Sequence, residues 1–132
     1  MIRVFIVEDH PIMRQSIRTL LAREADLEYC GEAATAEAAL EQIDDVRPDL
    51  VLIDVSLPGM NGIQLARALH ERRPRLALAM LSGHGGATHV QQALKAGARG
   101  YILKGRASEL PTAIRRLAAG ERYVSSELAG PE

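Results

Sequence analysis

Residues 50–59 read LVLIDVSLPG, and this stretch decides the fold. It opens with a short, continuous apolar run, which predicts a strand that is covered on both faces, as in parallel sheets. Pro58 and Gly59 then break the chain before the next periodic segment begins. Asp54 directly follows the apolar run, so we expect a carboxylate at the carboxyl end of a central strand.

Working outward from this stretch, apolar runs alternate with segments of helical period. Strands are predicted at residues 4–7, 27–31 (the weakest), 50–53, 76–81 and 101–103. Helices are predicted at residues 13–21, 36–43, 62–72, 90–97 and 110–118. Such alternation implies an α/β fold with right-handed crossovers and helices on both faces of a parallel sheet. Five strands favour the flavodoxin-like doubly wound (βα)5 arrangement, a five-stranded parallel sheet in the order 2-1-3-4-5.

Composition excludes several classes of protein. The chain has 132 residues, 47% of them hydrophobic and 25% charged, which is typical of one soluble globular domain. No apolar run is long enough to span a bilayer, and Cys30, the single cysteine, excludes an internal disulfide. One phenylalanine, three tyrosines and a net charge of −1 argue against direct nucleic-acid binding. We expect a cytoplasmic protein without a membrane partner.

Polar residues follow the predicted strands at the edge where ligands bind in this fold. Glu8 and Asp9 follow the first strand and Asp54 the third, and these strands are neighbours in the expected order. Two carboxylates about 5 Å apart repel by roughly 3 kcal/mol at an effective dielectric constant of 20, so a cation is expected among them. Oxygen ligands of this kind suit Mg²⁺. Ser82 and Lys104 bring a hydroxyl group and an ammonium group to the same crevice, as phosphoryl transfer to Asp54 requires.

Taken in order, these residues resemble the bacterial response-regulator receiver domain (CheY-like). The matching pieces cover residues 2–122 and are Glu8-Asp9, the run 54–58 with Gly62, Ser82, and the run 101–104. Residues 7–11 (VEDHP) and 118–125 (AAGERYVS) further resemble the NarL/FixJ branch.

The resemblance implies that Asp54 is a phosphoacceptor. It would take a phosphoryl group from the phosphohistidine of a sensor histidine kinase. Mg²⁺ would be held by Asp9, Asp54 and the backbone carbonyl of Ser56, with Glu8 acting mainly through water. On this view the chain is not a turnover enzyme but a domain that catalyses its own phosphorylation and dephosphorylation.

The resemblance also implies a switch. Lys104 would bind a phosphoryl oxygen, Ser82 would turn toward the phosphoryl group, and Tyr101 would move inward behind it. Ser56 and His84 occupy the positions expected to set the dephosphorylation rate. The surface whose affinity for a partner changes would be built from residues 90–97, 101–103 and 110–118.

Gly105 departs from the common receiver pattern, and two other residues, His10 and Cys30, belong to no motif. Gly105 follows the active-site lysine where many receivers have proline, commonly after a cis bond, which leaves the local geometry of Lys104 open. His10 has no partner pattern, and we interpret it as a surface residue. We interpret Cys30 as an inert strand residue.

We expect residues 1–122 to form the receiver domain. Residues 123–132 would begin a linker toward an absent output domain, a helix-turn-helix DNA-binding domain by family resemblance, and a phosphorylation-dependent homodimer is a further expectation. One alternative is a degenerate receiver that serves only as an interaction module. Another is an aspartate-nucleophile phosphatase, which the residues after Asp54 disfavour, because Val55 and Ser56 leave no second aspartate to act as general acid.

Overall fold

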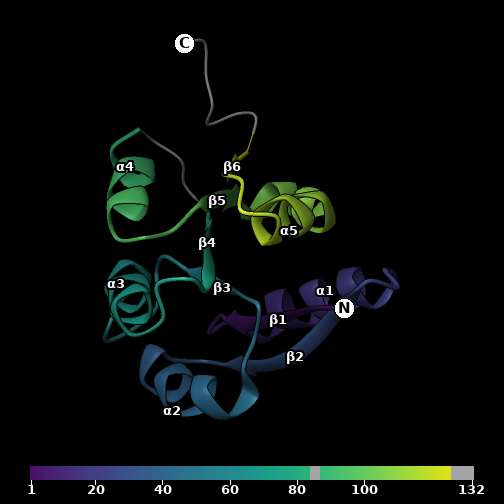
Figure 1. Cartoon of the computed structure of the whole chain (residues 1–132), viewed down its shortest axis with the longest axis horizontal. Helices are drawn as coiled ribbons and strands as arrows, with labels where there is room; N and C mark the ends of the chain where they lie inside the picture. Colours follow the sequence, from purple (N-terminus) through teal and green to yellow (C-terminus); the bar gives the residue numbers. More distant parts are fainter. Residues whose placement is uncertain (84–86, 126–132) are drawn as a thin grey trace.

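The computed structural model describes residues 1–83 and 87–125, in which strands and helices alternate (Figure 1). The strands are β1 (Ile2–Val7), β2 (Leu27–Ala33), β3 (Leu50–Asp54), β4 (Ala77–Ser82), β5 (Gly100–Leu103) and β6 (Tyr123–Val124). The helices are α1 (Pro11–Ala22), α2 (Ala36–Val46), α3 (Gly62–Arg72), α4 (Ala87–Lys95) and α5 (Leu110–Ala118), with a 3₁₀ turn at Lys104–Glu109. None of the described helices combines the length and the apolar character needed to cross a membrane.

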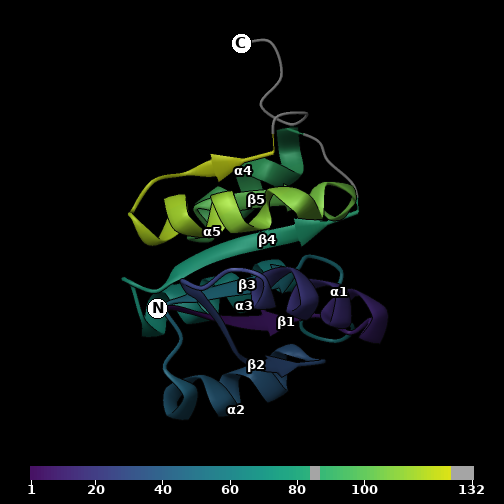
Figure 2. The same cartoon turned by 90° about the vertical axis from the view of Figure 1, so that its right-hand side faces the viewer.

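The strands form one parallel sheet in the order β2-β1-β3-β4-β5-β6, which confirms the predicted order of the first five. Helices α1 and α5 cover one face, and α2, α3 and α4 cover the other (Figure 1). Figure 2 turns the face with α1 and α5 toward the viewer. All five residues of β3 are buried, because both faces of this central strand are covered.

Two differences from the sequence prediction lie at the edges of the sheet. Strand β2 runs to Ala33 rather than stopping at Gly31, because Glu32 and Ala33 continue the pairing with β1. The predicted linker start is part of the sheet, since Tyr123 and Val124 pair with β5 as a sixth strand. Ser125, which follows, is fully buried. The folded unit therefore extends past residue 122, its predicted end.

A close contact between β3 and α3 fixes the position of Asp54. A Cβ atom on Gly62 would lie 2.2 Å from the Asp54 carbonyl oxygen, so only glycine fits at the first residue of α3. Asn61 caps the helix by accepting a hydrogen bond from the Gln64 amide, and the Gln64 side chain accepts one from the Asn61 amide. The helix is thus anchored against the end of the strand that carries the predicted phosphoacceptor.

Candidate functional site

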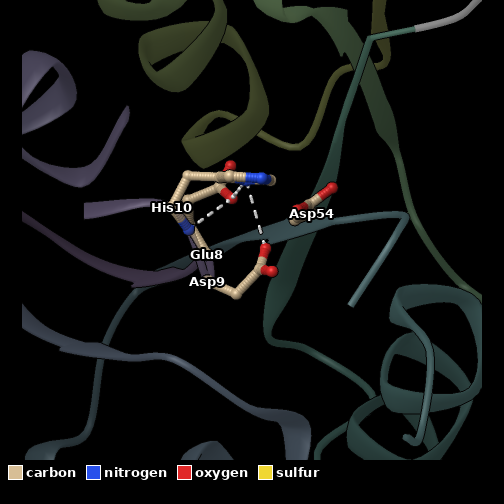
Figure 3. Close-up of side chains that lie close together, drawn as sticks. All are labelled: Glu8, Asp9, His10 and Asp54. Carbon is tan, nitrogen blue, oxygen red and sulfur yellow. Dashed lines mark hydrogen bonds and ion pairs between the residues drawn. The ribbon is translucent and has the colours of Figure 1, made fainter. Parts of the chain in front are cut away.

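Three carboxylates meet at the carboxyl edge of the sheet, as predicted (Figure 3). Glu8 and Asp9 lie directly after β1, and Asp54 is the last residue of β3. The Glu8 and Asp54 side chains are 0% and 1% exposed, and that of Asp9 is 30% exposed. One ligand atom from each of them, together with one from His10, lies within 4.8 Å of the others. The parallel arrangement produces this cluster, because β1 and β3 are hydrogen-bonded neighbours.

Lys104 reaches the same cluster from the end of β5. Its Nζ atom lies 2.8 Å from Glu8 Oε1 and 3.3 Å from Asp54 Oδ2. The described residues contain no cis peptide bond, so the bond between Lys104 and Gly105 is trans. The Lys104 side chain contacts both carboxylates with the backbone in this geometry. The structure therefore places the predicted ammonium group between two of the three carboxylates.

These contacts change the ionisation of the cluster. Burial alone raises the pKa of the Glu8 carboxyl, but hydrogen bonds with Lys104, Asp54 and His10 outweigh burial and lower it below its usual value. Burial lowers the pKa of Lys104, yet Glu8 and Asp54 raise it on balance. Glu8 and Lys104 are therefore both charged at neutral pH. Removal of either side chain would leave the charge of the other without this partner in a buried site.

The donor set fits a divalent cation. Buried oxygens of Glu8, Asp9 and Asp54 receive no hydrogen bond of good geometry from the described residues, although Lys104 and His10 lie within ion-pair distance of them. One ammonium group does not neutralise three carboxylates, so the cluster retains an excess of negative charge. Buried oxygens with free lone pairs are what Mg²⁺ uses as ligands.

The remaining predicted residues lie around this cluster. The Ser56 amide donates a 3.0 Å hydrogen bond to Asp54 Oδ1, which orients the carboxylate from the loop after β3. Ser82 ends β4, is 5% exposed, and pairs in register with Leu103 beside Lys104. Tyr101 is fully buried among the residues of the α2–α3–α4 face, the inward position that the resemblance implies for the modified state.

His84 lies outside the described residues, so its predicted position beside the attack path remains a prediction.

Sequence reasoning missed two residues at the site. His10 is exposed, as predicted, but it does have partners: its Nδ1 atom lies 2.9 Å from Glu8 Oε2 and 3.3 Å from Asp9 Oδ1. Arg14 donates a 2.7 Å hydrogen bond from Nη1 to the Glu8 carbonyl and a 2.9 Å bond from Nε to Glu32 on β2. Arg14 belongs to no sequence motif. The only sequence feature that could have indicated this contact is its position about one turn into α1, close to the loop that precedes the helix.

Comparison with known proteins decides the family. The family model of the response regulator receiver domain matches residues 4–115, which include every described site residue. The chain belongs to the response regulator receiver domains. Its resemblance to the NarL/FixJ branch is also confirmed by relatives: the receiver domain is 35% identical over 128 residues to the nitrate/nitrite response regulator protein NarL of Escherichia coli K12. It is likewise 35% identical over 130 residues to the response regulator GacA of Pseudomonas viridiflava.

The receiver domain covers only part of these relatives. The matches include 95% and 98% of this chain, but 58% of NarL and 61% of GacA. Solved structures agree. A LuxR-family response regulator from Aurantimonas sp. SI85-9A1 superposes with a TM-score of 0.92 at 34% identity, covering 96% of this chain and 91% of that one. The signal receiver domain of the putative response regulator NarL from Mycobacterium tuberculosis gives 0.85 at 34% identity, covering 91% and 98%. These findings favour neither the interaction module nor the phosphatase.

Proposed function

We propose that Asp54 is the phosphoacceptor of this receiver domain. A carboxylate oxygen of Asp54 forms a bond to phosphorus while the bond from phosphorus to the kinase histidine breaks, and the imidazole nitrogen leaves with that electron pair. Water later attacks phosphorus, which releases inorganic phosphate and restores the carboxylate. The domain thereby catalyses its own phosphorylation and dephosphorylation rather than turning over a free substrate.

The observation that carries this proposal is the position of Lys104 against the buried carboxylates. Its Nζ atom lies 2.8 Å from Glu8 and 3.3 Å from Asp54, so a positive charge is already held where phosphoryl oxygens would arrive. If a phosphoryl oxygen replaces one carboxylate beside Lys104, the ammonium group is ion-paired both before and after phosphorylation. Ser82, at the end of the neighbouring strand, supplies a hydroxyl group on the same side.

The cation of the proposed reaction is Mg²⁺. Asp9, Asp54 and the backbone carbonyl of Ser56 would hold it, with Glu8 acting mainly through water. When bound, the ion offsets the negative charge on the phosphoryl oxygens. Without it, the carboxylates repel an incoming phosphoryl group as well as one another.

We further propose that phosphorylation changes a partner surface formed by α4, β5 and α5. Ser82 would turn toward the phosphoryl group and thereby stabilise the inward position of Tyr101. The domain would then populate more of the conformation in which this surface binds its partner. Ser56 and His84 would set the rate of dephosphorylation. The partners are a sensor histidine kinase, a helix-turn-helix output domain that follows the folded unit, and a second copy of the domain. The cytoplasm is the proposed location.

The deciding experiment compares the wild-type domain with Asp54→Asn after incubation with Mg²⁺ and acetyl phosphate. We expect intact-mass spectrometry to detect one added phosphoryl group in the wild type and none in Asp54→Asn. Asp45→Asn, an exposed residue on α2, is the matched control and should behave as the wild type. Equal labelling of all three proteins would contradict the proposal.

A second measurement tests the switch. Beryllofluoride with Mg²⁺ should move the amide resonances of α4, β5 and α5, and size-exclusion chromatography should show a larger species if the second copy binds there. Resonances that move only beside Asp54, with elution as a monomer in both states, would contradict the partner-surface proposal while leaving the phosphoacceptor in place.

A further inference from the structure

His10 lies in the carboxylate cluster, yet the phosphoacceptor account gives it no role. It is the residue that precedes α1, a position from which side chains usually accept a hydrogen bond from the first turn of the helix. The His10 side chain makes no such bond. Its Nδ1 atom is instead turned toward the site, 2.9 Å from Glu8 Oε2 and 3.3 Å from Asp9 Oδ1 (Figure 3).

The distances allow a single cation to contact this nitrogen and the carboxylates together. The candidate ligand atoms of Glu8, Asp9, His10 and Asp54 all lie within 4.8 Å of one another. Opposite ligands of a first-row metal at about 2.1 Å from the ion are about 4.2 Å apart, so only small side-chain movements are needed. Glu8 Oε1 can keep its contact with Lys104 when Oε2 gives up its contact with the imidazole.

Because Nδ1 of His10 faces two carboxylates, it carries a proton, and a cation that binds there displaces this proton to water and leaves a neutral imidazole with its N–H at Nε2. Carboxylate and carbonyl oxygens suit Mg²⁺, whereas a nitrogen ligand favours first-row transition cations in the order of their general affinity for nitrogen donors. The carboxylates attract any divalent cation, because Lys104 offsets only part of their charge. The imidazole therefore increases the difference in affinity between transition cations and Mg²⁺ above the difference that the carboxylates alone would produce.

We propose that His10 is an additional metal ligand through Nδ1, and that this site binds divalent transition cations such as Co²⁺ in preference to Mg²⁺. The inference rests on the proposed function, because it concerns the same cation site, and it adds the class of cation that the site selects. It assigns His10 a binding role that the phosphoacceptor set of Asp9, Asp54 and Ser56 does not contain.

Isothermal titration calorimetry of the wild type and His10→Gln with Co²⁺ and with Mg²⁺ tests the proposal. We expect Co²⁺ affinity to fall by about tenfold in His10→Gln, whereas Mg²⁺ affinity stays within about twofold. His89→Gln, an exposed histidine on α4, is the matched control and should change neither value. In the proton NMR spectrum of the Co²⁺ complex, a strongly shifted exchangeable imidazole N–H signal should be present in the wild type and absent from His10→Gln.

Equal loss of affinity for the two cations, no loss for either, or a shifted imidazole signal that persists in His10→Gln would overturn the proposal. A labelling assay with acetyl phosphate and Mg²⁺ separates this failure from that of the proposed function. In that assay, failure of the proposed function leaves Asp54→Asn labelled as well as the wild type, whereas failure of the His10 proposal alone leaves the wild type labelled and Asp54→Asn unlabelled.

Discussion

Asp54 is buried beside two carboxylates and one ammonium group, and we expect its charge to oppose folding in the absence of a cation. We expect Asp54→Asn to raise the free energy of unfolding by about 1–2 kcal/mol in EDTA, because the lost repulsion from Glu8 and Asp9 exceeds the lost attraction to Lys104. In saturating Mg²⁺ the difference should vanish or reverse, since the wild type alone gains the full binding energy. Urea titrations under the two conditions measure this, with Asp45→Asn as the control. A loss of stability for Asp54→Asn in EDTA would show that Lys104 dominates the cluster.

Glu32 is the residue through which β2 supports the loop that carries Glu8. It accepts hydrogen bonds from Arg14, Arg18 and Tyr29. Burial raises the pKa of the Glu32 carboxyl, but the bonds from Tyr29 and Arg18 outweigh it and lower the pKa below its usual value. A carboxyl whose pKa is lowered on folding contributes stability above its ordinary pKa and loses it as the pH falls through the lowered value.

Glu32→Gln should therefore cost about 1 kcal/mol at pH 7, and the cost should shrink as the pH falls below about 4.5. Chemical denaturation at several pH values gives the two stability profiles. Glu41→Gln, on the exposed side of α2, should give a profile parallel to the wild type. If the difference between Glu32→Gln and the wild type were independent of pH, the ionised carboxylate would not be its source.

At the scale of elements, the junction of β3 and α3 has no space for a side chain. The added methyl group of Gly62→Ala would overlap the Asp54 carbonyl, which is backbone and cannot rotate away. We expect a loss of about 1–3 kcal/mol in thermal or urea unfolding and weaker phosphorylation, because Asp54 moves with its carbonyl. Gly105→Ala is the control for stability, since nothing lies within 4 Å of its added Cβ. Equal stability of the two variants would mean that the junction is not closely packed in solution.

Ser125 joins β6 to β5 and to the 3₁₀ turn that follows. Its hydroxyl group accepts a 3.1 Å hydrogen bond from the Leu103 amide and donates a 2.9 Å bond to Glu109 Oε2. Ser125→Ala removes a partner from both groups in a partly buried place, so we expect a cost of about 1–3 kcal/mol and faster hydrogen exchange at Leu103. Ser16→Ala, which removes an exposed bond within α1, should change stability by less than about 0.5 kcal/mol. Unchanged exchange at Leu103 would contradict the role of Ser125.

At the scale of the whole molecule, the two faces of the sheet hold separate apolar clusters that share every central strand. Leu69 on α3 and Ile114 on α5 are fully buried on opposite faces. We expect Leu69→Ala and Ile114→Ala each to cost about 2–5 kcal/mol. Circular dichroism and tyrosine fluorescence should nevertheless report one coincident unfolding transition in both variants. Separate midpoints for the two signals would mean that each face unfolds independently.

The same scale explains what the sequence could predict. Strands covered on both faces are continuously apolar, so 50–53 and its neighbours were recognisable, and the residue after each one followed. Strand β6 could not be recognised from the sequence, because two residues are too few to show a period. Only its pairing with β5 makes it a strand. His10 and Arg14 were missed for a related reason. The contacts of these two side chains depend on the direction in which the backbone enters α1. That direction cannot be predicted from the residue types alone.

Strand β6 also determines where the chain leaves the domain. Helix α5 carries the chain back along the sheet, residues 119–122 connect it to β6, and because β6 is parallel to β5, Ser125 lies again at the edge that holds Lys104. A polypeptide attached after Ser125 thus departs from the rim of the chemical site rather than from the opposite pole. Its starting point is bonded to Leu103, the residue before Lys104. A displacement of this lysine would therefore reach an attached domain through one peptide unit and one hydrogen bond, without passing through a helix.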